Sequence, residues 1–71
     1  MYRYPVVIEK AKRNYSAYSP DLPGCVATGA TERETLSRMR TAIKFHLEGL
    51  KKEGSEIRGP STKVKYLEIT V

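Results

Sequence analysis

The sequence has few of the residues that usually stabilise a very small protein. Its 71 residues include one cysteine, Cys25, one histidine, His46, and no tryptophan. A lone cysteine excludes an internal disulfide, and one cysteine with one histidine falls short of a four-ligand zinc site. A chain of this length buries only about 60% of its unfolded surface. We therefore expect it to gain stability by homo-oligomerisation, as a dimer or a tetramer.

Long hydrophobic runs are also missing. Residues 1–5 hold no apolar region of the kind a signal peptide needs, and no stretch approaches the ~20 apolar residues of a membrane span. We expect a cytoplasmic protein that makes no membrane contact.

The sequence offers no set of residues for catalysis. Its single histidine, His46, falls beside the apolar stripe of a helical segment, and Cys25 follows a glycine at the start of a short strand. Both are expected to pack rather than react, since a nucleophile needs an adjacent base. The acidic residues form no cluster with metal-binding spacing, and no glycine-rich phosphate loop is present. The sequence therefore predicts no catalytic residue, no metal and no cofactor, and we expect a protein that is not an enzyme.

Positive charge exceeds negative charge by five, from 13 Lys and Arg against 8 Asp and Glu. The basic residues are scattered along the chain. They are consistent with an acidic partner, either a nucleic acid or a protein, and equally with an ordinary solvated surface.

Hydrophobic periodicity predicts strand, strand, strand, helix, strand. The expected bounds are residues 2–10, 15–19, 25–29, about 32–53, and 63–71. This order indicates an α+β fold, a four-stranded and mostly antiparallel sheet with one long helix on one face. We expect the other face to be covered by another subunit.

The helix has clear start and stop signals. Thr31 and Glu34 have the capping-box spacing, and Gly54 suits the position just after the last turn. One apolar stripe at helical period runs through Leu36, Met39, Ile43, Leu47 and Leu50. Phe45 falls outside this stripe, so we interpret it as an oligomer contact.

The segment Ser19–Cys25 predicts a rigid corner. Pro20 and Pro23 fix φ and remove backbone donors, and Gly24 is free to take a positive φ. Asp21 suits turn chemistry, with a contact to a partner or a metal as the alternative.

The last predicted strand has apolar residues on both faces, Val64 and Tyr66 on one and Leu67, Ile69 and Val71 on the other. Such a strand is either sandwiched or part of a subunit interface. The predicted oligomer interface therefore consists of Tyr66, Leu67, Ile69, Val71 and Phe45.

These motifs together resemble a known family. The strand Tyr4–Lys10, the run Tyr15–Val26 containing Pro-Asp-Leu-Pro-Gly-Cys, and the Gly29-Ala30-Thr31 helix start closely resemble the N-terminal domain of HicB-family antitoxins. The resemblance implies a partial ribonuclease-H-like fold without catalytic carboxylates, and direct binding that neutralises a small mRNA-cleaving toxin, HicA.

On this resemblance the corner becomes a partner-binding edge made of Tyr18, Pro20, Asp21, Leu22 and Pro23. Residues 1–71 are expected to form a single HicB-like domain with no separate DNA-binding domain. The alternative function is RNA binding by the basic surface, with bases stacked on the tyrosines.

Overall fold

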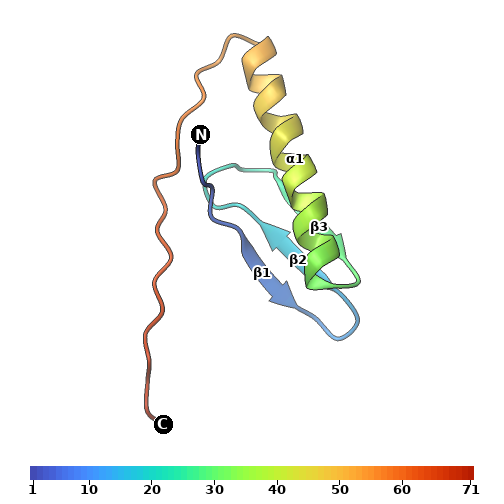
Figure 1. Ribbon diagram of the computed structural model, residues 1–71, viewed down its shortest axis with the longest axis vertical. Helices are drawn as coiled ribbons and strands as arrows, with labels where there is room; N and C mark the ends of the chain where they lie inside the picture. The colour runs from blue at the N-terminus through green and yellow to red at the C-terminus, as the bar shows by residue number, and fades with distance from the viewer.

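A computed structural model describes all 71 residues as a three-stranded sheet, one helix and an extended C-terminal segment (Figure 1). The strands β1 (Val7–Lys10), β2 (Tyr15–Tyr18) and β3 (Val26–Gly29) form an antiparallel meander in the order β1-β2-β3. The helix α1 (Glu32–Lys52) packs over β3 and β2 on one face of this sheet. The predicted α+β class and the order of these four elements are confirmed.

Strand pairing divides the sheet into a helix-facing side and an outer side. Ile8, Ala17 and Ala27 lie directly opposite one another across the three strands, and all three pack in the core beneath the helix. Side chains alternate along a strand, so the neighbouring row of Val7, Tyr18 and Val26 faces away from the helix. The short hairpin between β1 and β2 is closed by a hydrogen bond from the Ala11 N–H to the Asn14 carbonyl, 2.8 Å.

The helix begins and ends where its capping residues place it. The Glu34 N–H donates to Thr31 Oγ1 at 3.0 Å, and Gly54 takes a positive φ of 73° after the last turn. Only half of the expected capping box forms, because the Glu34 carboxylate pairs with Arg38 at 2.7 Å instead. The helix ends at Lys52, one residue before the expected end.

The core is small and lies under the middle of the helix. Ala17, Leu22, Cys25 and Met39 are its buried apolar residues. The predicted helical stripe is confirmed but only partly covered: Met39 is buried, Ile43 and Leu47 are half-buried, and Leu36 remains 42% exposed. The helix therefore has more apolar surface than this sheet covers.

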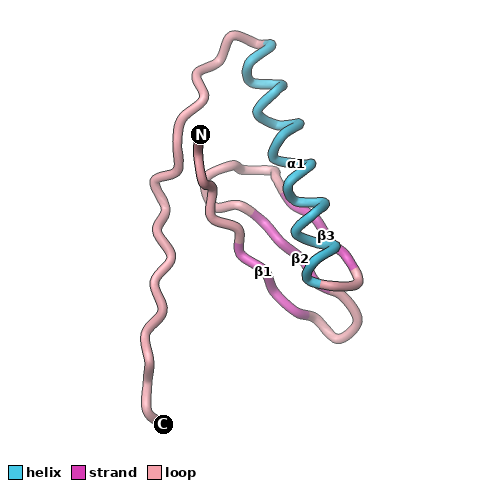
Figure 2. The backbone as a smooth tube through the Cα atoms, in the orientation of Figure 1, coloured by secondary structure: helices cyan, strands magenta, loops and turns pink.

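The prediction of a fourth strand is wrong for this chain. Residues 63–71 are extended but form no strand, make no backbone hydrogen bond, and are all exposed (Figure 2). Their β-rich composition favours an extended backbone, but a strand also needs a neighbour with which to pair. Within one chain, this segment runs apart from the open edge of β1 (Figure 1).

The first strand is also shorter than predicted, beginning at Val7 rather than at residue 2. Pro5 has no N–H to contribute to a ladder, which is consistent with pairing that starts after it. No helix has the length and apolarity that a membrane span requires.

Candidate partner-binding surface

The corner between β2 and β3 is fixed by its own backbone. The Leu22 N–H donates to the Ser19 carbonyl at 3.2 Å, and the Cys25 N–H donates to the Leu22 carbonyl at 3.1 Å. Gly24 has φ 87°, which residues with a Cβ rarely adopt. The buried Ser19 hydroxyl also donates to the Pro5 carbonyl at 3.0 Å. The corner is therefore closed on itself and tied to the segment that leads into β1.

Asp21 holds the C-terminal segment against this corner. Its Oδ1 accepts four hydrogen bonds, from the N–H and hydroxyl of Ser61 at 3.0 and 3.0 Å and from those of Thr62 at 3.2 and 3.1 Å. The Ser61 N–H makes the largest contribution to lowering the pKa of Asp21, and desolvation opposes it only in part. Asp21 is thus the anchor of a segment forty residues further along the chain.

The sequence interpretation of Asp21 missed this contact. Turn chemistry was the expected role, but Oδ1 accepts from Ser61 and Thr62 rather than from the corner's own backbone, and Oδ2 is buried without a hydrogen-bond partner. The available signal was the pair of hydroxyl residues that follows Gly59-Pro60, which supplies four donors in two residues. A carboxylate accepts several such donors readily.

Two tyrosines reinforce the same attachment. The Tyr4 hydroxyl donates to the Arg58 carbonyl, and the Tyr2 ring lies against Gly59, where an added Cβ would come within 2.8 Å of it. The two rings meet edge to face, with centroids 6.1 Å apart. Desolvation raises the pKa of Tyr4. Residues 58–62 are therefore held along the N-terminal segment and the corner.

The five residues expected to bind a partner point in different directions. Leu22 is only 6% exposed and belongs to the core, and Asp21 is engaged by the C-terminal segment. Pro20 and Pro23 are exposed at the corner, and Tyr18 is exposed on the outer side of the sheet. Three of the five side chains are thus exposed to a partner, whereas Leu22 packs in the core and Asp21 binds the C-terminal segment.

The outer side of the sheet carries an apolar row beside the corner. Val7, Tyr18 and Val26 are aligned across β1, β2 and β3, and Val26 is 66% exposed. We call Val7, Tyr18, Val26 and Pro20 the outer patch. It was not recognised from the sequence, because the register that aligns these residues is set by pairing between strands.

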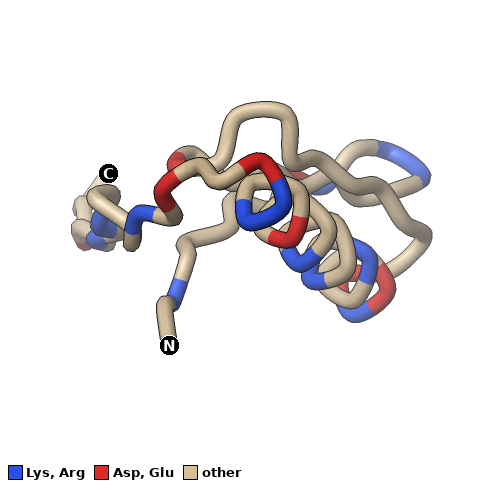
Figure 3. Tube along the Cα trace, turned by 90° about the horizontal axis from the view of Figure 1, so that it is seen from above, with Lys and Arg blue, Asp and Glu red and all other residues tan.

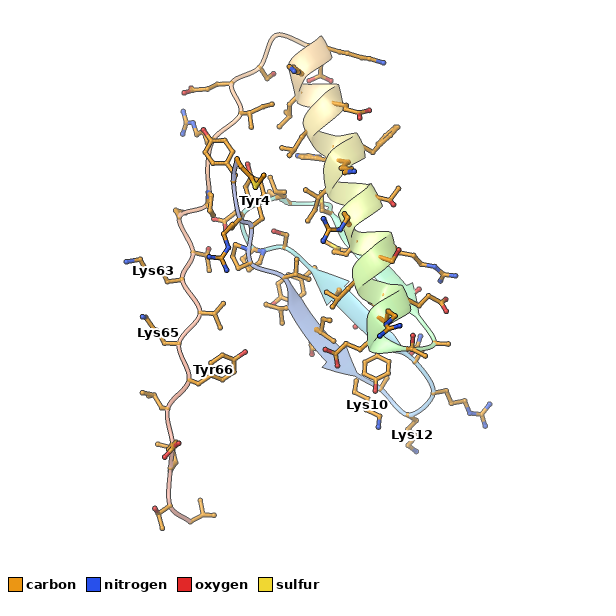
Figure 4. The ribbon with its side chains drawn as sticks, in the orientation of Figure 1. Tyr4, Lys10, Lys12, Lys63, Lys65 and Tyr66 are labelled. Atoms are coloured by element: carbon orange, nitrogen blue, oxygen red, sulfur yellow. The ribbon has the colours of Figure 1, made fainter.

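The predicted oligomer residues do not meet one another within a single chain. Phe45 is 77% exposed and lies on the side of α1 opposite the apolar stripe. Tyr66, Leu67, Ile69 and Val71 are exposed along the extended segment. Figure 4 shows Lys63 and Lys65 projecting from one side of this segment and Tyr66 from the other.

The residues considered for chemistry are dispersed. Cys25 is buried at 4% exposure, and burial raises the pKa of its thiol, which keeps it protonated. His46 is half-buried on the helix. No three His, Cys, Asp or Glu side chains converge as a group that could hold a metal ion.

Comparison with known proteins places the chain in a family. A family model described as the HicB-like antitoxin of bacterial toxin–antitoxin systems matches residues 4–69. The chain belongs to the HicB-like antitoxin family. The match includes the corner, the helix and the extended segment, so the resemblance seen in the sequence is confirmed.

Relatives of this HicB-like chain occur in a phage, an archaeon and a bacterium. An uncharacterised 14.9 kDa protein from the rep-hol intergenic region of Haemophilus phage HP1 is 39% identical over 54 residues, covering 76% of this chain and 41% of that protein. A UPF0150 protein of Thermoplasma acidophilum is 38% identical over 56 residues, covering 78% and 81%. A UPF0150 protein of Helicobacter pylori is 42% identical over 41 residues, covering 58% and 57%.

The matched part of the chain thus spans less than half of the phage protein and most of the archaeal one. No solved structure matches the chain.

Proposed function

We propose that this HicB-like chain is an antitoxin that neutralises an mRNA-cleaving toxin of the HicA type by binding it directly. Family membership over residues 4–69 is the observation that carries the proposal. The role is non-catalytic: the chain covers the toxin's active surface rather than acting on a substrate. A cytoplasmic site of action, a single domain and a ribonuclease-H-like fold belong to the same proposal.

The outer patch is the surface that we assign to the toxin. Tyr18 and Val26 are apolar, exposed and mounted on paired strands, and Pro20 is fixed by the closed corner. A preorganised surface of this kind loses little conformational freedom on binding. Tyrosine is also among the residues enriched where binding energy concentrates.

Nucleic-acid binding is the alternative function, and the distribution of charge gives it less support. Figure 3 shows Lys and Arg on the β1–β2 hairpin, along the helix and on the C-terminal segment, with Asp and Glu interspersed on the helix. Arg38 is already engaged, by Glu34 and by the Thr28 carbonyl at 2.9 Å. A nucleic-acid site usually gathers its positive charge on one face.

The test is co-expression and co-purification of the tagged chain with a small basic HicA-like protein, sought first in the reading frames that flank its gene. We expect the unmodified chain to retain the toxin and to restore growth when the toxin is induced. Tyr18→Glu and Val26→Glu each place a charge in the outer patch and should weaken retention by about tenfold or more, because a buried apolar side chain contributes ~1.5–3 kcal/mol.

Ser16→Glu is the matched control, since Ser16 lies on the same side of the sheet but in the next row, outside the outer patch. It should leave retention unchanged. If no complex forms and growth is not restored, the antitoxin role is wrong. If a complex forms but all three variants behave alike, the assignment of the outer patch is wrong. Salt-sensitive binding of RNA without any toxin complex would favour the alternative.

A further inference from the structure

We propose that residues 63–71 of one chain add as a fourth strand to the open β1 edge of a second copy, and that the second copy reciprocates. Three parts of the molecule carry this inference. They are an extended segment without a partner, a sheet edge without a neighbour, and an apolar groove between the helix and the N-terminal segment that leads into that edge.

Residues 63–71 have an extended backbone but pair with no strand. Residues 63–71 make no backbone hydrogen bond and are all exposed, although they include Leu67 at 83% and Ile69 at 73% exposure. The anchor at Asp21 fixes Ser61 and Thr62, so the segment leaves the body of its own chain at a defined point. Beyond that point it runs clear of the sheet (Figure 1).

The receiving edge is β1. This strand pairs with β2 on one side only, so its other side presents unpaired backbone groups. Between the N-terminal segment and the helix lies a groove of about 540 Å³, lined mostly by apolar side chains. Val6 contributes from the β1 side, and Leu36, Met39, Ile43 and Leu47 contribute from α1.

The dimensions of the two parts agree. In an extended strand Leu67, Ile69 and Val71 point to the same side and span about 13 Å. Leu36 to Leu47 spans about 16 Å along the helix. A strand added to β1 would direct one of its faces toward the helix, where the exposed part of the apolar stripe lies. The segment thus supplies the apolar face that the groove requires.

The single chain exposes more surface than a compact monomer of its mass, and the excess is large enough for a dimer interface. Its accessible surface is 6354 Å², whereas a compact monomer of 8.0 kDa exposes about 4,450 Å². Its radius of gyration is 14.0 Å, against about 11 Å for a compact domain of this length. The excess of about 1,900 Å² exceeds the ~800 Å² that each partner buries in a standard interface.

A second copy is the occupant because every copy carries both the segment and the edge. Reciprocal exchange gives a closed two-fold dimer in which the same contact is made twice. It also covers the exposed stripe residue Leu36 together with Leu67 and Ile69, which no contact within one chain does.

The first test is the mass of the full chain in solution by sedimentation. We expect a dimer at micromolar concentration, twice the 8.0 kDa of one chain. Ile69→Glu should weaken dimerisation by about tenfold or more, because it replaces one buried aliphatic side chain with a charge. Thr70→Glu, the neighbouring position on the opposite strand face, should leave dimerisation unchanged. A monomeric unmodified chain, or equal effects of the two variants, would overturn the proposal.

The second test identifies what each segment contacts. In a Cys25→Ala background, chains carrying only Leu67→Cys are mixed with differently tagged chains carrying only Leu36→Cys, and a short bismaleimide is added. We expect a cross-link between the two kinds of chain, and none when Thr41→Cys, on the other side of the helix, replaces Leu36→Cys. Cross-links only between two Leu67→Cys chains would show tail-to-tail pairing instead. A cross-link within one chain carrying both substitutions would show that the segment binds its own edge. Either result, or no cross-link, contradicts the exchange.

Discussion

At the scale of single residues, Asp21 and Gly29 each perform a task that their neighbours in sequence do not reveal. Asp21 closes the contact between the corner and residues 61–62 through one carboxylate oxygen. Gly29 ends β3 directly beneath the helix, where a Cβ would lie 2.7 Å from Thr35 Oγ1 and 3.0 Å from the Thr35 N. Both residues join parts of the fold that are separated along the chain.

The Asp21 anchor should be lost in acid. Hydrogen bonding lowers the pKa of Asp21 in the folded chain, so its contribution is complete above the ordinary aspartate value of about 3.9 and is lost as the pH falls through the lower, folded value. The measurement is the pH titration of the Ser61 and Thr62 amide signals by NMR. Their midpoint should fall below 3.9, and Asp21→Asn should abolish the transition. A midpoint at or above 3.9 would contradict the assigned anchor.

Alanine substitutions at Gly29 and at Gly49 should change the free energy of unfolding in opposite directions. Gly29→Ala forces the new methyl group against Thr35, whose hydroxyl is held by the Thr31 carbonyl at 2.7 Å, and should lower the free energy of unfolding by about 1–3 kcal/mol. A Cβ added at Gly49 would have no atom within 4 Å, so Gly49→Ala should raise the free energy of unfolding by about 0.5–1 kcal/mol through helix propensity. Urea denaturation of both variants checks the pair, and a shared sign would refute this account of the helix–sheet contact.

At the scale of elements, local sequence signals predict the helix well but do not predict the pairing of the extended segment. The N-cap, the stripe and the C-terminal glycine are local signals, and they predicted α1 to within one residue at its end. The β1–β2 hairpin was equally local. The β-rich composition of residues 63–71 predicted a strand, but composition does not reveal which sheet edge, or which chain's edge, a strand will join. The outer patch could not be predicted from the sequence either, because it depends on the register between strands. The corner beside it could be predicted, because its prolines and glycine are local signals.

The cap should account for a measurable part of helix stability. Thr31→Ala removes the acceptor for the Glu34 N–H and should lower the free energy of unfolding by about 1 kcal/mol. Thr41→Ala is the matched control, because the Thr41 hydroxyl is exposed and makes only a 3.4 Å contact with the Ser37 carbonyl. Its effect should stay within about 0.5 kcal/mol. Equal losses in thermal or urea denaturation would show that the cap contributes nothing specific.

At the scale of the whole molecule, the chain leaves separate surfaces open. The outer patch lies on the side of the sheet away from the helix, β1 forms one edge of the sheet, and the groove lies between the N-terminal segment and α1. Because the two surfaces differ, a dimer formed through the edge would still present one outer patch on each copy. The proposed dimer could therefore bind a toxin on each of its two copies.

The formal net charge of +5 gives a prediction at this scale. A basic toxin would be repelled at long range, so short-range apolar contact must provide the affinity. Association should therefore become faster as salt is raised from about 0.05 to 0.5 M, since screening reduces the repulsion. Stopped-flow or surface-binding measurements of the association rate check this, and slower association at high salt would indicate attraction between opposite charges instead.

Inhibition of a HicA-like toxin by the purified chain tests the proposed antitoxin role most directly. A HicA-like toxin that co-purifies with this chain is incubated with an mRNA substrate while the chain is added in increasing amounts. We expect cleavage to fall in proportion to added chain and to end near equimolar amounts, and we expect Val26→Glu to shift this end point to a large excess. Undiminished cleavage at a large excess of the unmodified chain would contradict the antitoxin role.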